Sequence, residues 1–347
     1  MNWRAPFACI ALYFLGGITW AASPTPKGRD HNNSAAAAPQ IRPEAGFTAK
    51  ILASPDRLDC PSSMIPRGST VWLTDRGAHG GEVLEAALGG KLKVLIGSGM
   101  LPILSGFDLA PSDFGDGGGQ LFALAQTRTA AGNPDEEIKR IDLTKQSAAT
   151  FCALPGGDKS IGDFGGDARF GPPDTSFANT LFTTSQHGTI DAAYPDGTCI
   201  AFANLSKFGA PAAITFSADG SAMLVTVGPR ESSIAAKGMI LRVDSDGAIE
   251  SKPVATGLTQ PGGLDLAPAG FGAYTAEIFV VDQGDAAQGA GSIGGKVYRT
   301  DSSGKLTLVA SGFDHPVGLR FVGEHLWVTG GDSGREPNGY IVQIDAQ

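Results

Sequence analysis

The sequence repeats itself, and this repeat constrains the fold more than any other feature. The ten residues Gly106–Gly115 (GFDLAPSDFG) recur as Gly263–Gly272 (GLDLAPAGFG), 157 residues later, and the alignment continues without a gap to Gln126 and Gln283. Within this long period lies a shorter one, in which a run of apolar or threonine residues precedes a polar, glycine-containing break. It occurs at residues 71–74, 121–124, 181–184, 223–226, 278–281 and 326–329. Such a chain is expected to pack equivalent units side by side.

Each unit contains the pattern of four short strands. A segment with a polar residue between apolar ones precedes the repeated run, as in Phe107–Leu109 and Leu319–Phe321. A third strand follows, as in Gly238–Leu241, and a glycine-containing turn such as Asp301–Gly304 leads to a fourth, as in Leu306–Ala310. Glycine is favoured in these turns because it adopts positive φ without strain. Six such units predict an all-β fold, a six-bladed β-propeller with four antiparallel strands per blade.

The two ends of the chain complement each other. The sixth unit stops after its third strand, at Ile344–Asp345, whereas Phe47–Leu52 alternates like a strand but belongs to no unit. We expect this N-terminal strand to supply the missing outer strand, close the ring and cover the sheet edge. Composition agrees with short strands and tight turns, because 49 of the 347 residues are glycine and only 18% are charged. A β-sandwich or an irregular β-solenoid is the alternative.

The N-terminus has the layout of an export signal. An apolar run from Ala5 to Trp20 follows a single positive charge, and small residues stand at the cleavage positions before residue 22, so residues 1–21 are expected to be a signal peptide. A membrane anchor is the alternative, but the run is shorter than the roughly 20 residues that a span needs. Residues 22–45 read as a disordered linker, and residues 46–347 as the propeller. The protein is expected to be periplasmic or secreted and unattached to a membrane after cleavage.

Charge and cysteine content restrict the partners and the cross-links. The formal net charge of −9 disfavours nucleic acid as a partner, because nucleic acid binds basic surfaces. We expect a small-molecule ligand and a monomer. Signal cleavage would leave three cysteines, which permit at most one internal disulfide. Cys152 and Cys199 hold similar places in neighbouring units and are the expected pair, which leaves Cys60.

The repeat resembles that of NHL-like and gluconolactonase-like six-bladed propellers, which combine a Pro-x-Gly-Leu strand, an "LWVT" or "IFVV" strand and an "I-x-R-x-D" strand. More narrowly, residues 211–285 resemble the soluble aldose and sorbosone dehydrogenases, which use pyrroloquinoline quinone. The resembling stretches are Ile214–Gly220, Gly238–Gly247, Ala255–Leu264 and Asp282–Gly284. This resemblance implies a quinone cofactor with Ca²⁺, placed near Arg230, Gln260, Asp282 and Gln283.

The sequence departs from that dehydrogenase pattern at its chemical centre. The family carries a catalytic histidine just before the "LxFxxDG" strand, where this chain has Pro211–Ala213. The family's Arg-Asn-Pro motif is replaced here by Thr259–Pro261. A base that takes a proton from a sugar alcohol is therefore missing at the expected place.

Three histidines map to one face of the predicted ring. In a propeller, the loops before the first strands and between the second and third strands gather around the axis on that face. His79, His187 and His315 lie in such loops, and so do Asp163, Asp167 and Asp314. The three imidazoles would suit Zn²⁺ or Cu²⁺, or an acid or base near neutral pH. The alternative is three ordinary loop residues in separate blades.

The polar residues of the first strands form a second candidate site along the axis. They are Asp108, Arg169, Thr215, Asp265 and Arg320. A charge between core residues is costly unless it is paired or hydrated. The residues would line a channel for a cation, a sugar or a carboxylate, or they would form a salt-bridge plug. Because the four charges sum to zero, the plug is favoured.

These features predict an exported propeller that binds a small molecule, in particular a carbohydrate, in its axial bowl. One alternative is an oxidoreductase similar to the quinone-dependent sugar dehydrogenases, with His187 as a base from another blade. A second is a metal-dependent lactonase or lyase that uses His79, His187 and His315 with a divalent metal. A protein-interaction scaffold is the third. The chain has no Gly-x-Ser-x-Gly elbow, which excludes an α/β-hydrolase.

Overall fold

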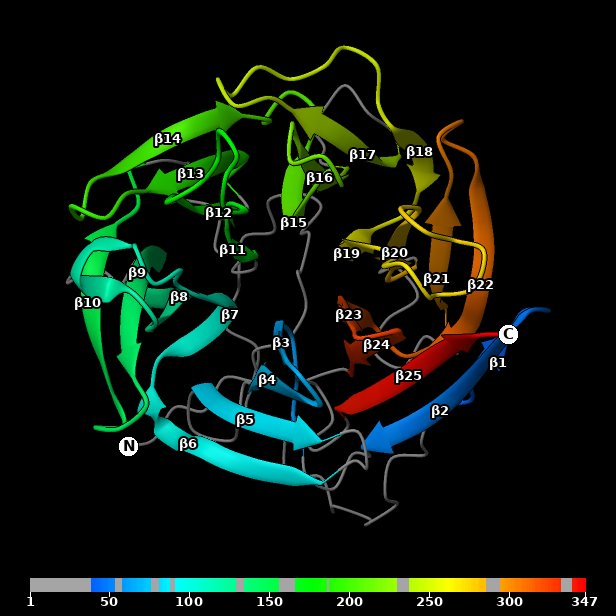
Figure 1. Cartoon of the computed structure of the whole chain (residues 1–347), viewed down its shortest axis with the longest axis horizontal. Coiled ribbons are helices and arrows are strands. Elements are labelled where there is room, and N and C mark those ends of the chain that lie inside the picture. Colours follow the sequence, from blue (N-terminus) through cyan, green and yellow to red (C-terminus); the bar gives the residue numbers. More distant parts are fainter. Residues whose placement is uncertain are drawn as a thin grey trace, which may run out of the picture.

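The computed structural model describes ten segments of the chain, and six antiparallel sheets in these segments form the blades of a propeller (Figure 1). The described residues are 39–53, 58–75, 81–87, 91–128, 134–155, 166–185, 187–229, 237–284, 294–331 and 339–347. The predicted signal peptide and most of the predicted linker lie outside them. The sheets surround a common axis, with the first strand of each blade innermost, as the repeat predicted.

Blades 1 to 5 are each built on four antiparallel strands in chain order, and blade 6 combines three consecutive strands with an outer strand from the N-terminal part of the chain. Blade 1 consists of β3 (Met64–Arg67), β4 (Thr70–Asp75), β5 (Gly81–Ala87) and β6 (Leu92–Leu101). Blade 2 consists of β7 (Ile103–Leu109), β8 (Leu121–Arg128), β9 (Pro134–Asp142) and β10 (Ser147–Ala153), and a short 3₁₀ helix lies at Gly115–Gly117. Blade 3 consists of β11 (Ala168–Phe170), β12 (Leu181–Ser185), β13 (Thr189–Ala193) and β14 (Cys199–Asn204).

The remaining blades follow the same order. Blade 4 consists of β15 (Ala210–Phe216), β16 (Met223–Gly228), β17 (Gly238–Val243) and β18 (Ala255–Leu258). Blade 5 consists of β19 (Pro261–Leu266), β20 (Ile278–Asp282), β21 (Gly295–Thr300) and β22 (Leu306–Phe313). Blade 6 consists of β23 (Pro316–Val322), β24 (His325–Gly330), β25 (Tyr340–Ala346) and β2 (Phe47–Ala53).

The N-terminal residues contribute to two blades. Strand β2 pairs with β25, from Phe47 opposite Ala346 to Ala53 opposite Ile341, and forms the outer edge of blade 6. Residues Arg42–Pro43, which the sequence placed in the linker, form β1 and add a fifth strand to the edge of blade 5. Pro43 is tolerated there because an edge strand does not need every amide. The ordered part of the chain therefore begins before residue 46.

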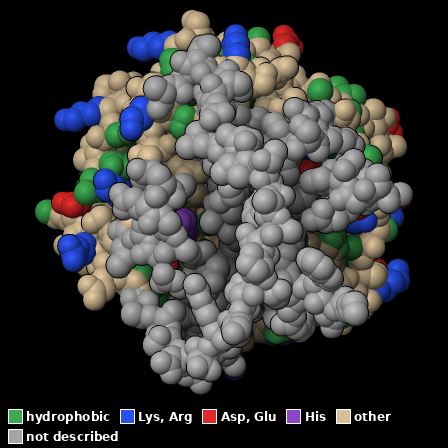
Figure 2. All heavy atoms as spheres, turned by 180° about the vertical axis from the view of Figure 1, so that it is seen from behind, with side chains coloured by type: hydrophobic (Ala, Val, Ile, Leu, Met, Phe, Trp, Pro, Cys, Tyr) green, Lys and Arg blue, Asp and Glu red, His purple; other side chains and the backbone are tan. Residues whose placement is uncertain are grey.

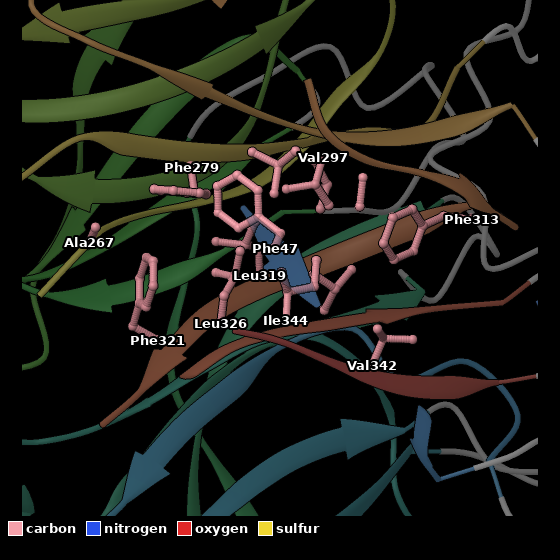
Figure 3. Close-up of a cluster of buried hydrophobic side chains, with 14 of the residues drawn as sticks. Phe47, Ala267, Phe279, Val297, Phe313, Leu319, Phe321, Leu326, Val342 and Ile344 are labelled. Atoms are coloured by element: carbon pink, nitrogen blue, oxygen red, sulfur yellow. The ribbon is translucent and has the colours of Figure 1, made fainter. Parts of the chain in front are cut away.

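The core is divided among the spaces between neighbouring blades. Figure 3 shows one such space, in which Phe279 and Val297 from blade 5 pack against Leu319 and Val342 from blade 6. Phe47 of β2 joins this cluster and is 6% exposed. Burying a large apolar side chain contributes about 1.5–3 kcal/mol, so the blade interfaces account for much of the fold's stability.

The repeated glycines explain how closely neighbouring first strands approach. A Cβ atom on Gly106 would overlap the backbone of Asp167 and Ala168 in the next blade. A Cβ atom on Gly263, at the same place in the second copy of the motif, would meet the backbone of Gly318 and Leu319. Glycine is required at both positions because any side chain would push the blades apart.

Cys152 and Cys199 form a disulfide, as the sequence predicted. Cys152 lies on β10 and Cys199 on β14, so the bond joins the outer strands of blades 2 and 3. A disulfide stabilises chiefly by limiting the conformations of the unfolded chain. This one fastens the outer rim of a single blade interface.

Candidate functional site

The predicted axial residues lie in one layer of the ring. Each faces the large apolar or aromatic residue of its second strand in the antiparallel register. The first-strand residues are Ile65, Asp108, Arg169, Thr215, Asp265 and Arg320, and their respective partners are Trp72, Phe122, Phe182, Leu224, Phe279 and Trp327. Their strands β3, β7, β11, β15, β19 and β23 surround the axis in Figure 1. We call the space that this layer surrounds the lumen.

Two carboxylates of this layer connect neighbouring blades. Asp108 accepts hydrogen bonds from the backbone N–H of Leu109 and, in blade 3, of Phe170, both at 2.8 Å. Asp265 accepts them at 3.0 Å from Leu266 and, in blade 6, from Phe321. The repeated Asp-Leu-Ala-Pro motif therefore has the same structural role in both copies. Burial raises the pKa of Asp108, and the positive charge of the nearby guanidinium group in blade 3 only partly opposes this.

Arg320 forms an ion pair with Asp167 across the lumen. Its guanidinium donates to Asp167 Oδ2 at 2.8 Å and to the carbonyls of Leu264 and Leu319 at 3.0 and 2.8 Å. Asp167 belongs to the loop before β11 in blade 3, opposite blade 6 in the ring (Figure 1). This ion pair is what the plug interpretation requires.

Arg169 is not engaged in the same way. Its Nε lies 3.7 Å from Asp167 Oδ2, and the side chain donates no hydrogen bond to any described residue. Burial lowers the pKa of Arg169, and the positive charge of Arg320 lowers it further, against the attraction of Asp167, Asp265 and Asp108. The two axial arginines therefore differ, since Nη1 and Nη2 of Arg320 donate hydrogen bonds, whereas no described residue accepts one from Arg169.

The carboxylate of Asp282, at the end of β20, accepts hydrogen bonds from backbone amides before β19 and after β20. Its Oδ2 accepts from Thr259 N at 2.8 Å, and its Oδ1 accepts from Gln260 N at 2.8 Å and Gly284 N at 3.2 Å. Asp75 makes the equivalent bonds to the loop before β3 in blade 1. The structure thus shows a structural role for a residue that the sequence placed near a cofactor.

The described residues supply only part of the expected quinone site. Arg230, the charged residue expected beside the cofactor, lies outside the described residues. Both oxygens of Asp282 already accept backbone amides, which leaves only the side chains of Gln260 and Gln283 from the expected set. Quinone and Ca²⁺ binding therefore stay predictions from the resemblance alone.

Gln260 and Gln283 are almost fully buried beside the start of blade 6. They are 6% and 7% exposed, and Gln283 N donates to Gln260 O at 2.9 Å. The position that a Cβ would take on Gly262 lies 3.5 Å from Gln283 Nε2 and 2.8 Å from Val317 O on β23. The Gln283 amide therefore reaches toward the strand that begins just after His315.

His315 is held in a rare backbone conformation. Its φ is 45°, in the left-handed region that a non-glycine residue seldom adopts, and its Nδ1 lies 2.9 Å from Asp314 Oδ1. The carbonyl of Asp314 accepts hydrogen bonds from Tyr340 Oη at 2.9 Å and Gly331 N at 3.0 Å. Burial, and then the charge of Asp314, raise the pKa of Tyr340, so its hydroxyl stays a donor. Strained residues of this kind cluster at functional sites.

His187 belongs to a different polar group, between blades 2 and 3. Its Nε2 lies 3.9 Å from Glu136 Oε2, and Ser185 Oγ donates to the same oxygen at 2.7 Å. Asp191 lies in the same interface and is completely buried, and burial raises its pKa to about 6. The sequence analysis missed Glu136 and Asp191. Their only sequence signal is a carboxylate at a core-facing position of a strand.

The structure does not bring the predicted histidines into one group. His79 lies outside the described residues. His187 pairs with Glu136 at the blade 2–3 interface, whereas His315 pairs with Asp314 in blade 6, on the opposite side of the ring. Among the residues that the structure describes, no three His, Cys, Asp or Glu side chains are placed to hold a metal ion. A three-histidine metal site stays a prediction.

The surface and the helices add two observations. Figure 2 shows the molecule from behind the view of Figure 1. The Lys and Arg side chains on this face lie separately around its rim. No helix within the described residues is long and apolar enough to cross a membrane.

Comparison with known proteins shows the fold and no close relative. No family model and no curated protein matches the chain. The soluble aldose sugar dehydrogenase of Escherichia coli in its apo form is similar, with a TM-score of 0.60 and 14% identity over 87% of this chain and 100% of that one. A gluconolactonase from Xanthomonas campestris reaches 0.58 with 15% identity over 89% and 97%, and virginiamycin B lyase from Staphylococcus aureus 0.53 with 17% identity over 87% and 100%.

Sequence identities this low establish architecture and leave activity open. Each of these structures is covered almost completely by the chain. The six sheets, their strand order and these likenesses agree with the resemblance seen in the repeat. The chain is thus a six-bladed β-propeller, similar in fold to gluconolactonase and sugar dehydrogenase propellers.

Proposed function

We propose that the chain is an exported propeller that binds a small polyhydroxylated molecule, of the carbohydrate class, at the mouth of the axial lumen. The proposal rests on three buried polar residues near the boundary of blades 5 and 6, Gln260, Gln283 and His315. All three side chains are polar and less than one-tenth exposed. Ligand sites combine a concave, largely buried setting with a few placed polar groups.

The chemistry of this group suits hydroxyl groups. Amide and imidazole side chains combine donor and acceptor atoms, which are the groups that recognise hydroxyls. Asp314 fixes the imidazole through Nδ1, and Tyr340 and Gly331 fix the backbone beneath it. A preformed set of groups lowers the entropy lost on binding. The strained φ of His315 is consistent with a position kept for a ligand.

The test is ligand binding by the mature chain and two site variants. Binding of neutral aldoses and aldonolactones is measured by calorimetry and by thermal unfolding. A ligand at 100 times its Kd stabilises the folded state by about 2.7 kcal/mol. We expect Gln260→Ala and His315→Ala to weaken binding at least about tenfold, since each removes a hydrogen bond to a buried group.

His325→Ala is the matched control, because His325 also pairs with an aspartate, Asp345, but at the other end of β24. It should bind like the wild type. Failure of all neutral sugars and lactones to bind would contradict the proposal. Dye reduction with pyrroloquinoline quinone and Ca²⁺, and metal analysis with added Zn²⁺, examine the dehydrogenase and the lactonase or lyase alternatives in the same preparation.

A further inference from the structure

The guanidinium of Arg169 has hydrogen-bond donors that nothing in the described structure uses. Nε and Nη2 are both buried and have no hydrogen-bond partner. These two nitrogens form the edge of arginine that binds a carboxylate through two parallel N–H···O bonds. Arg320, in the same layer, donates three hydrogen bonds. A buried donor without a hydrogen bond destabilises the folded state, and a charged donor does so more strongly.

The neighbouring carboxylates are already occupied. The three aspartates near the lumen are Asp108, Asp167 and Asp265, and each of their six oxygens accepts at least one hydrogen bond. The donors are the backbone N–H of Leu109, Phe170, Ala168, Ile214, Leu266 and Phe321, the hydroxyl of Thr215 and the guanidinium of Arg320. None of these oxygens accepts a hydrogen bond from Arg169, and the nearest, Asp167 Oδ2, lies 3.7 Å from its Nε.

The unused donors of Arg169 require an acceptor, and a carboxylate is the acceptor that binds this edge of a guanidinium most strongly. Arg320 lowers the pKa of Arg169, so the two cations destabilise each other, and a negative group beside Arg169 would relieve this. Asp167, Asp265 and Asp108 attract Arg169, but none of them accepts a hydrogen bond from its Nε or Nη2. A metal ion would not serve, because it cannot accept a hydrogen bond from an N–H group.

We propose that Arg169 binds the carboxylate of a ligand inserted into the lumen, so that the natural ligand is a sugar acid or another polyhydroxylated acid. The inference rests on the proposed function and names its substrate class. Arg169 follows Asp167 by two residues, and Asp167 lies where the loop before β11 meets the strand. A carboxylate on Arg169 thus lies within the ring, while the hydroxyl groups extend toward the mouth.

The test compares an acidic sugar, a neutral sugar of similar size and a small carboxylate without hydroxyl groups. Sodium glucuronate, glucose and sodium acetate are titrated at constant ionic strength into the wild type, Arg169→Gln and Arg169→Lys. We expect the wild type to bind glucuronate at least about tenfold more tightly than glucose, because a bidentate, charge-assisted pair is stronger than neutral hydrogen bonds. Arg169→Gln should lose this preference, and Arg169→Lys should keep only part of it, since lysine lacks the planar fork.

Arg242→Gln is the control, because Arg242 lies on β17, pairs with Glu250 and changes the net charge equally. It should retain the preference for glucuronate. If glucuronate binds no more tightly than glucose, or if Arg169→Gln keeps the preference, the inference is wrong while sugar binding stands. If only acetate binds, and only when Arg169 is present, the lumen site stands and the carbohydrate proposal fails. Should the variants not fold, the comparison of probes on the wild type decides.

Discussion

Asp191 is a carboxyl group buried in blade 3, and no described Lys, Arg or His side chain forms an ion pair with it. It is 0% exposed, Thr189 Oγ1 donates to its Oδ2 at 3.2 Å, and its Oδ1 has no hydrogen-bond partner among the described residues. Thr183, directly opposite on β12, is also buried with an unused hydroxyl. Burial therefore disfavours the ionised form and raises the pKa of Asp191 to about 6.

Asp191→Asn should stabilise the protein at neutral pH. In the folded state the group holds its proton up to about pH 6, whereas in the unfolded chain it ionises near 3.8, so stability falls as pH rises between these values. Above pH 6 the full cost applies, about 3 kcal/mol, and the amide avoids it. Urea unfolding at pH 7.5 and pH 4 should show a gain only at pH 7.5.

Asp246→Asn, in an exposed turn, is the matched control for this charge change and should alter stability little at either pH. An equal stability of Asp191→Asn and the wild type at pH 7.5 would show that the buried carboxyl carries no such cost.

At the scale of the strand, a threonine near the end of the second strand connects one blade to the next. Thr226 Oγ1 accepts from Ala213 N in its own blade at 2.9 Å and donates to Gly262 O in the next blade at 2.8 Å. Thr184 makes the same connection from blade 3 to blade 4, and Thr329 from blade 6 to blade 1. The repeated threonine is therefore an interblade connector.

Thr226→Val should lower the free energy of unfolding by about 1–3 kcal/mol, because it leaves a buried amide and a buried carbonyl without their partner. Thr226→Ser keeps the hydroxyl and should lose less. Thr256, exposed on β18, supplies the control, since Thr256→Val removes a hydroxyl that faces solvent. Chemical denaturation of the three variants measures the differences, and equal losses for Thr226→Val and Thr256→Val would contradict the connector role.

At the scale of the whole molecule, the sequence predicted the blades because their signals are local. Strand alternation, turn glycines and the repeat all act within about 50 residues. The pair Cys152–Cys199 also followed from equivalent places in adjacent units. The site was harder to predict, because Arg320 meets Asp167 across 153 residues and Asp282 turns to backbone amides. Nothing in a single strand distinguishes Arg169 from Arg320.

We expect the disulfide to stabilise one blade interface more than the others when the ring unfolds. It joins the outer strands of blades 2 and 3, on the rim of the interface that contains Asp191 and Glu136. The double variant Cys152→Ser/Cys199→Ser should lose about 2–5 kcal/mol of stability. Hydrogen exchange should rise most in β10 and β14 and along this one interface, because the other blade contacts are unchanged. A uniform rise around the ring would show instead that the propeller opens as one cooperative unit.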